Sequence, residues 1–162
     1  MKTIIVYYSR KGNDNIRGEI VNLSVSKIEE AAKEIAKLTG GDLFEIKTVV
    51  PYAEDYPTFL QQAQQESQVQ ARPRLAGTMP DIRDYDVIYL GYPNWWGTAP
   101  MAVFTFLEQA DFTGKVIKPF STSEGNGLGK SIRDIQQACP FAIVKPGLVI
   151  RENDPLLEEW VR

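Results

Sequence analysis

Histidine is absent from this chain of 162 residues, and cysteine occurs once. Without histidine the chain has no Ser-His-Asp or Cys-His catalytic group, no histidine-ligated zinc and no ordinary proton shuttle near neutral pH. A single cysteine excludes an intrachain disulfide, and Cys139 lies near the end of a predicted helix, where a small buried residue is favoured over a reactive thiol. We therefore expect no metal site, and we expect any chemistry to come from a bound cofactor.

Strong charge and long apolar runs are also lacking. The formal net charge is −3 and no basic stripe appears, so neither nucleic acid nor an anionic membrane surface is expected as a partner. No apolar run approaches the roughly 20 residues that span a bilayer. The amino terminus is too short and lacks the cleavage site of a secretory signal, and it is typical of a strand instead. We expect one cytoplasmic domain over residues 1–162.

Predicted strands alternate with predicted helices along the chain. The apolar and β-branched runs predict strands at 3–8, 42–48, 86–90, 115–121 and 141–150, the last interrupted at Pro146-Gly147. Helical spacing predicts helices at 27–38, 56–70, 100–109, 127–138 and 155–162. The glutamine-rich helix 56–70 is polar and is expected to be a solvated cover. This order predicts an α/β fold, a doubly wound five-stranded parallel sheet with helices on both faces.

The segment Gly91–Met101, with the sequence GYPNWWGTAPM, is the most informative in the chain. It directly follows the apolar strand predicted at 86–90, and we expect its prolines and Gly97 to end that strand. The result is a rigid aromatic loop at the carboxyl end of a central strand, where open α/β sheets bind ligands. The indole faces of Trp95 and Trp96 suit a flat conjugated ligand. The alternative is that both tryptophans cap a core or plug an interface.

Two further loops have unusual compositions and are expected at the same edge of the sheet. Ser9-Arg10-Lys11-Gly12-Asn13 opens a connection that continues to Val25, far longer than the usual ~2–6 residues, and its hydroxyl, cations and glycine suit a phosphate. Ser24–Lys27 adds an N-cap and further hydroxyls before the helix. The loop Ser121–Gly129 has three glycines in its last five residues, so its backbone can approach a ligand closely; a tight turn with a helix cap is the alternative. Together the three loops indicate a site for a mononucleotide with a planar head group.

At these residues the chain resembles the flavodoxin family over nearly its whole length. Tyr7–Asn13 resembles the family's phosphate loop, and Gly91–Thr98 resembles the loop beside the isoalloxazine ring. Ser121–Gly129 is similar to the glycine-rich third loop of the subgroup with a long phosphate loop and a Trp-Trp-Gly sequence. The resemblance implies a three-layer sandwich with strand order 2-1-3-4-5, a noncovalently bound FMN, and one-electron transfer between redox partner proteins, a reductase and an acceptor.

The resemblance and the loop chemistry together define a candidate FMN site, in which no residue is assigned a catalytic role. Ser9, Lys11, Asn13, Ser26 and Lys27 are the candidates for the phosphate. Trp95 and Trp96 are expected to bracket or edge the ring, and Gly97 to turn its peptide so that a carbonyl or an N–H faces the flavin N5. The expected cofactor-binding residues are Ser9, Lys11, Gly12, Asn13, Ser26, Lys27, Pro93, Asn94, Trp95, Trp96, Gly97, Thr98, Thr122, Glu124, Gly125, Asn126 and Gly127.

Two alternatives stay open beside an FMN-binding electron carrier. The first is a flavodoxin-like reductase that takes hydride from NAD(P)H and passes it to a quinone or a nitro compound. The second is an interaction module on the same fold that binds no flavin. It is kept open by Ser26-Lys27-Ile28, which stands where long-loop relatives repeat Gly-Asn-Thr before the helix.

Overall fold

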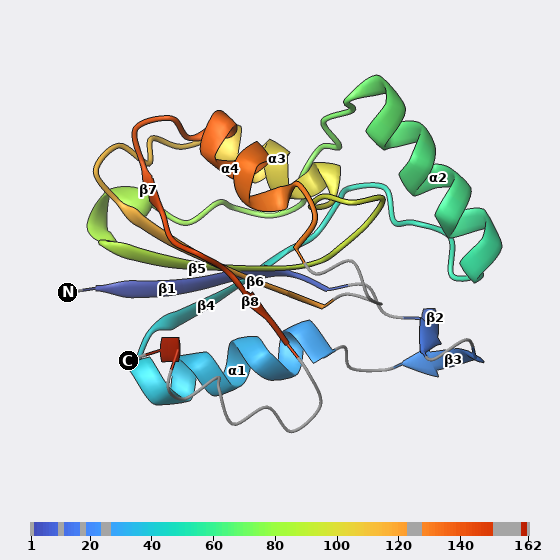
Figure 1. The fold of residues 1–162 in the computed structure, drawn as a ribbon, viewed down its shortest axis with the longest axis horizontal. Coiled ribbons are helices and arrows are strands. Elements are labelled where there is room, and N and C mark those ends of the chain that lie inside the picture. The colour runs from blue at the N-terminus through green and yellow to red at the C-terminus, as the bar shows by residue number, and fades with distance from the viewer. Residues whose placement is uncertain are drawn as a thin grey trace.

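The computed structural model describes residues 2–9, 12–16, 19–23, 27–122, 128–150 and 160–161, with the backbone alone for 12–16 and 19–23. Within these ranges no helix combines the length and the apolar character needed to cross a bilayer. Parallel strands form the main sheet, and helices lie above and below it (Figure 1). The strands of this sheet are β1 (Thr3–Tyr8), β4 (Asp42–Ile46), β5 (Val87–Pro93), β6 (Val116–Thr122), β7 (Ile143–Val144) and β8 (Leu148–Val149).

The strand order of this sheet is β4-β1-β5-β6-β7, and β8 pairs with β6 beyond β7. Counted along the chain, with β7 and β8 as two parts of a fifth strand, this is the expected order 2-1-3-4-5. The prediction that Pro146-Gly147 interrupts the last strand is confirmed, because the two parts pair with different stretches of β6. The topology places the carboxyl ends of the central strands β1, β5 and β6 side by side.

Each face of the sheet buries its own core, because successive side chains of a strand point to opposite faces. The even-numbered side chains of β1 and β5 pack with helices on one face, and the odd-numbered ones pack with a helix on the other. In Figure 1 helix α1 lies below the sheet, whereas α3 and α4 lie above it and α2 lies beyond their end. The helices are α1 (Lys27–Thr39), α2 (Tyr56–Val69), α3 (Met101–Glu108) and α4 (Ser131–Ala138).

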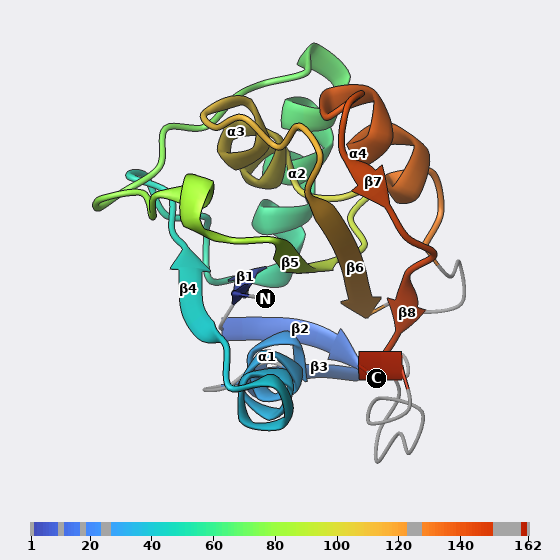
Figure 2. The same cartoon turned by 90° about the vertical axis from the view of Figure 1, so that its left-hand side faces the viewer.

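The long connection between β1 and α1 contains a β-hairpin that the sequence did not predict. Strands β2 (Gly12–Ile16) and β3 (Glu19–Leu23) pair antiparallel to each other and form a sheet of their own, joined to no other strand among the residues that the structure describes. Gly12 lies opposite Leu23, so the chain leaves β1 and returns to α1 at nearly the same place. Figure 2 shows the hairpin on the α1 side of the sheet. A segment expected to be one long loop therefore contains a hairpin, which separates the predicted phosphate residues at the end of β1 from those at the start of α1.

The strand before the tryptophans is longer than expected, and the prediction that Pro93 ends it early was wrong. Gly91, Tyr92 and Pro93 continue β5 and pair with Phe120, Ser121 and Thr122 of β6. The proline is tolerated because it is the last residue of the strand, where only one ladder donor is missing. Gly91 is required by packing, since a Cβ placed there would lie 2.3 Å from the Phe120 ring.

The remaining boundaries differ from the predictions by a few residues at element ends. Strand β4 ends at Ile46, and Thr48 forms only an isolated bridge with Leu75. Helix α4 begins at Ser131 rather than 127, because residues 128–130 form a turn that contacts the tryptophan loop. Of the helix predicted at 155–162, only residues 160–161 lie within the described part of the chain, and these are helical.

Candidate functional site

The candidate site lies at the carboxyl edge of the three central strands. Ser9 directly follows β1, while Pro93 and Thr122 are the paired last residues of β5 and β6. The backbone N–H of Asn94 donates to the carbonyl of Thr122 over 3.0 Å, which carries the strand pairing one residue further. Predicted site residues from three segments distant in sequence, Ser9, Asn94 and Thr122, are thereby brought to one edge.

Trp95, Trp96, Gly97 and Thr98 form a tight turn just beyond this edge. The backbone N–H of Trp95 donates to the carbonyl of Thr98 over 2.9 Å, and the reciprocal bond measures 3.3 Å. Both central residues have positive φ, 56° at Trp96 and 83° at Gly97, which defines a type I′ turn. Glycine adopts this conformation at low cost, whereas a bulky residue at positive φ is an outlier held by its surroundings.

The turn is fastened to the loop that follows β6. The carbonyl of Gly97 accepts a 2.7 Å hydrogen bond from the backbone N–H of Lys130. Gly129 lies directly against it, since a Cβ on Gly129 would stand 2.3 Å from the carbonyl oxygen of Gly97. The buried Thr98 hydroxyl donates to a carboxylate oxygen of Asp134 on α4 over 2.7 Å. Two of the three predicted loops, the tryptophan loop and the glycine-rich loop, are therefore in contact, and Thr98 serves to anchor one to α4.

The two tryptophans have different environments. Trp95 lies within an edge-to-face aromatic cluster, with ring centroids 5.3 Å from Tyr8, 5.4 Å from Tyr52 and 4.6 Å from Phe59. Trp96 remains 49% exposed on its positive-φ position. Trp95 is therefore fixed by packing from three other segments, whereas about half of the Trp96 side chain is open to solvent.

Next to Trp95, a partly buried hydrogen bond joins the β4–α2 connection to helix α2. The hydroxyl of Tyr52 donates to Oε1 of Glu66. Burial, followed by the bond from Tyr52 to Glu66, raises the pKa of the Tyr52 phenol, and burial also raises the pKa of Glu66, partly opposed by the same bond. The backbone N–H of Ala53 donates to Oε1 of Gln62 over 2.9 Å, so the connection is held to α2 at a second point.

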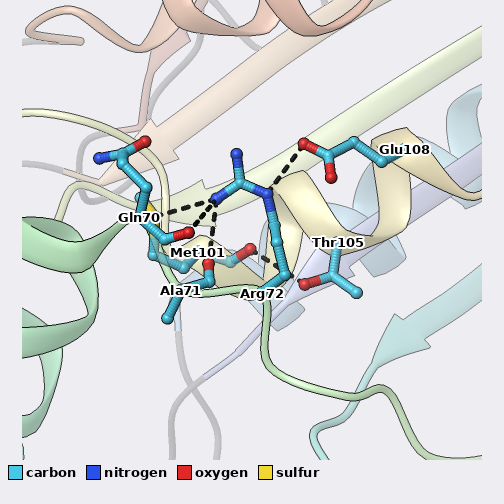
Figure 3. A network of polar contacts seen from close by, with 6 residues as sticks. All are labelled: Gln70, Ala71, Arg72, Met101, Thr105 and Glu108. Atoms are coloured by element: carbon cyan, nitrogen blue, oxygen red, sulfur yellow. Dashed lines mark hydrogen bonds and ion pairs between the residues drawn. The ribbon is translucent and has the colours of Figure 1, made fainter.

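Arg72 fixes the carboxyl end of α2 against α3 (Figure 3). Its Nε donates to Oε2 of Glu108 over 2.8 Å, and its Nη1 donates to the carbonyls of Gln70 and Ala71 over 3.2 and 3.0 Å. These two carbonyls follow the last residue of the helix, and a guanidinium is well suited to hold several acceptors at once. Helix α2, which carries Phe59 and Glu66, is therefore held near its middle and at its carboxyl end.

Two cavities lie beside helix α2, and one of them borders the tryptophan turn at Thr98. One, of about 370 Å³, lies between α2, α3 and α4 and is lined by Thr98, Arg72, Glu108, Lys130 and Asp134 among others. The other, of about 500 Å³, lies beside the β4–α2 connection and is lined by Val49, Val50, Tyr52, Glu66 and Val69 among others. The first is lined by charges of both signs, whereas the second is largely apolar, so the two differ in the ligands that they suit.

At the predicted phosphate end, the structure describes only part of the candidate set. Lys27 is the first residue of α1, so its side chain accompanies the unpaired N–H groups of a helix amino terminus. The backbones of Gly12 and Asn13 lie in β2, opposite Leu23 and Asn22. The predicted site residues outside the described part of the chain are Lys11, Ser26, Glu124, Gly125, Asn126 and Gly127.

Sequence reasoning missed the support of the site more than the site itself. Tyr8, Tyr52 and Phe59 surround Trp95. Tyr8 belongs to the predicted phosphate loop but carries no predicted role there, and neither Tyr52 nor Phe59 stands in a motif. One signal was available: Phe59 and Ala63 are spaced by four residues in a helix otherwise polar, and both are buried. The prediction that α2 is a solvated cover is thus incomplete, because its one apolar stripe packs on the tryptophan.

An open parallel sheet with an aromatic turn and polar loop residues at its carboxyl edge defines a mononucleotide-binding class of α/β protein. A family model described as flavodoxin matches residues 20–162, and the chain belongs to the flavodoxin family. Among the curated proteins compared, none matches the chain.

Solved structures similar to this chain include two provisionally assigned flavoproteins. One, from Bacteroides eggerthii, has 27% identity and a TM-score of 0.80, with 99% of this chain and 95% of that chain covered. The other, from Bacteroides uniformis, has 25% identity and a TM-score of 0.78, with coverage of 99% and 97%. A flavoprotein from Lactobacillus acidophilus, solved in complex with FMN, has 22% identity and a TM-score of 0.74, with 99% of each chain covered. The flavodoxin-like fold is thereby established.

Proposed function

We propose that this chain binds FMN at the carboxyl edge of the sheet and transfers single electrons between partner proteins. The observation that carries the proposal is Trp96, a bulky side chain held at φ 56° and left half exposed beside the ends of β5 and β6. Residues in such unfavourable conformations cluster at ligand clamps, where the surrounding structure holds them in place. Membership in the flavodoxin family and the FMN complex of the Lactobacillus acidophilus relative support the same cofactor.

The described residues fit FMN in the chemistry that they offer. An indole face suits a flat conjugated ring, and Trp95 is immobilised by Tyr8, Tyr52 and Phe59, so its ordering is complete before a ligand arrives. Ser9, Asn94 and Thr122 offer hydroxyl and amide groups at the same edge. When bound, FMN supplies reversible one-electron chemistry, and the chain supplies binding, orientation and electrostatics.

We assign the phosphate to the amino terminus of α1. The backbone N–H groups of the first turn and the charge of Lys27 suit a dianion. The pairing of Gly12 with Leu23 brings the segment after Ser9 back towards the same helix start. Lys11 and Ser26 complete this proposed set, and the residues Glu124, Gly125, Asn126 and Gly127 are proposed to face the ring from the third loop.

The test is a titration of the purified chain with FMN, FAD and riboflavin, followed by tryptophan fluorescence and flavin absorbance. FMN is expected to quench the tryptophan fluorescence and to bind more tightly than FAD, because the chain offers one phosphate loop and lacks the acidic ribose-binding fingerprint of dinucleotide sites after its first glycine turn. Tighter binding of FAD, or no binding of any flavin, would overturn the proposal and favour the interaction module. Rapid NAD(P)H oxidation with a quinone acceptor would favour the reductase instead.

Gly97 provides a test that separates an electron carrier from a protein that only holds flavin. The carbonyl of Gly97 is committed to Lys130, whereas within the described part of the chain neither the Trp96 carbonyl nor the Gly97 N–H has a backbone partner. We infer that the 96–97 peptide is the one that contacts the flavin N5. Gly97→Ala meets open space but carries the positive-φ cost of about 1–2 kcal/mol. We expect it to change the separation of the two one-electron potentials while the affinity for oxidised FMN changes little; the reverse pattern would mean that Gly97 only makes room for the indoles.

A further inference from the structure

Two oxidisable rings in contact, those of Trp95 and Tyr52, lead from the tryptophan turn to a cavity beside the β4–α2 connection. The Trp95 and Tyr52 centroids are 5.4 Å apart at an interplanar angle of 86°, so the ring edges are in contact. Phe59 packs against both rings, at 4.6 Å from Trp95 and 5.9 Å from Tyr52. A phenylalanine ring is far harder to oxidise than indole or phenol, so it excludes water from the pair without competing for the electron. Electron transfer between touching rings is fast, and Trp95 and Tyr52 form such a pair.

The phenol of this pair has a proton acceptor in place. Oxidation of a phenol makes it strongly acidic, so a tyrosine radical forms readily only where a base can take the proton. The Tyr52 hydroxyl donates directly to the carboxylate of Glu66. The geometry is fixed from both sides, by the Ala53–Gln62 hydrogen bond on the tyrosine side and by the Arg72 contacts at the end of α2. Burial raises the pKa of Tyr52, so the neutral phenol keeps its proton until it is oxidised.

We propose that Tyr52 and Glu66 form a proton-coupled redox site that receives an oxidising equivalent from Trp95. In the step, one electron passes from Tyr52 to the neutral indolyl radical of Trp95, and the phenolic proton passes to Oε1 of Glu66. The indole nitrogen takes a proton from water, which leaves a hydroxide ion, intact Trp95, a Tyr52 phenoxyl radical and a protonated Glu66. An external one-electron donor later reduces Tyr52, and Glu66 returns the proton. Charge and atoms balance at each stage.

The position of Tyr52 and Glu66 makes the radical accessible to a reductant. Tyr52 and Glu66 both line the apolar 500 Å³ cavity, where a soluble reductant can reach the phenoxyl radical. The natural oxidant rests on the proposed function, since a flavin excited by blue light is a strong one-electron oxidant and would lie beside the tryptophans. The relay then moves the radical from Trp95 to Tyr52, where a soluble reductant can reduce it. The site is therefore a protective exit for oxidising equivalents.

The experiment uses the full chain without flavin, so that its outcome is independent of FMN binding. Azide radicals generated by pulse radiolysis oxidise tryptophan preferentially, and the indolyl band is then followed as it decays into the phenoxyl band. Trp160→Phe serves as the parent, because Trp160 has its own tyrosine neighbour, Tyr89, at 5.5 Å. We expect the indolyl radical to convert to the phenoxyl radical with a first-order rate constant that is independent of protein concentration and lower in D₂O than in H₂O. Tyr52→Phe and Glu66→Gln, each in this parent, are expected to slow the conversion about tenfold or more, the scale of losing one charge-assisted hydrogen-bond partner.

Tyr85→Phe is the matched control. Tyr85 also donates to a carboxylate, Asp42, over 2.7 Å, but in the part of the chain that the structure describes it has no ring contact with a tryptophan. Removal of the Tyr85 hydroxyl should leave the rate of conversion from the indolyl to the phenoxyl radical unchanged. The proposal is overturned if Tyr85→Phe slows the conversion as much as Tyr52→Phe, or if Tyr8→Phe alone abolishes it. Should Tyr52→Phe fail to fold, Glu66→Gln and the isotope comparison decide, because equal rates with glutamine or in D₂O would exclude transfer of the proton to Glu66.

Discussion

Gly129→Ala should loosen the tryptophan turn from a residue outside it. Gly129 has φ 55°, and a Cβ there would stand 2.3 Å from the Gly97 carbonyl oxygen and 2.9 Å from its carbon. These are backbone atoms, so no flexible side chain can move aside and the turn itself must shift. The 2.7 Å bond from the Lys130 N–H to the same carbonyl is lost with that shift.

The magnitude follows from two costs. An alanine at positive φ costs about 1–2 kcal/mol, and a lost hydrogen bond costs about 1 kcal/mol. We therefore expect the free energy of unfolding to fall by about 2–3 kcal/mol, a large share of the roughly 5–15 kcal/mol that stabilises a domain. The measurement is urea unfolding followed by circular dichroism, together with an FMN binding isotherm. FMN affinity should fall too, because Trp95 and Trp96 belong to the displaced turn.

Gly77→Ala is the matched control. Gly77 has φ 82° and open space around its would-be Cβ, so its alanine variant pays the conformational cost alone. Gly129→Ala should destabilise the fold more than Gly77→Ala and should also weaken FMN, whereas Gly77→Ala should leave FMN unaffected. Equal destabilisation by the two variants, with FMN affinity unchanged in both, would refute the contact between the two loops.

Three further predictions concern single side chains. Lys27→Gln should weaken FMN binding by about ten- to a hundredfold but riboflavin binding little. Lys33→Gln, at an exposed position further along the same helix, should leave the affinity for both unchanged. Equal losses for FMN and riboflavin would place the Lys27 charge away from the phosphate. Burial raises the pKa of Glu66, so the folded state binds the carboxyl proton of Glu66 more tightly than the unfolded state does. The free energy of unfolding should therefore fall as the pH rises from the ordinary glutamate pKa to the raised one. Glu66→Gln should flatten that slope in urea titrations at a series of pH values, and an unchanged slope would assign it to other groups. Burial, with the Glu108 charge, raises the pKa of the Cys139 thiol to about 11. A disulfide reagent at mildly alkaline pH should therefore react with Cys139 only as fast as the protein unfolds. An immediate reaction in the native state would contradict the burial of this thiol.

The order of the sheet and the meeting of its loops were predictable because they depend on patterns along the chain. The alternation of apolar strands with amphipathic helices implied a parallel sheet, and a parallel sheet gathers Ser9, Asn94 and Thr122 at one edge. The hairpin was not predictable, since β2 has the sequence GNDNI, which carries almost no strand signal by itself and gains its pairing only from β3.

The contacts that support the site depend on side chains far apart in sequence, and no local pattern announces them. Tyr52 meets Trp95 only because α2 is held against the end of the sheet, and Gly129 matters only because Gly97 lies against it. The strand through Pro93 illustrates the same limit. Proline is uncommon within strands because it lacks a backbone N–H donor, but as the last residue of β5 it leaves the preceding hydrogen bonds of the strand in place. Tertiary contacts therefore decided each point at which local preference was a poor guide.

The pairing of Gly12 with Leu23 makes the long connection between β1 and α1 insensitive to its own length. Because the two ends of the hairpin are held next to each other, residues added between Ile16 and Glu19 lengthen the excursion without separating Ser9 from Lys27. The entropy cost of enlarging such a closed loop rises only slowly with the number of residues. This point in the chain is therefore where a peptide tag, a fluorescent reporter or a whole second domain can be inserted with little effect on the edge of the sheet.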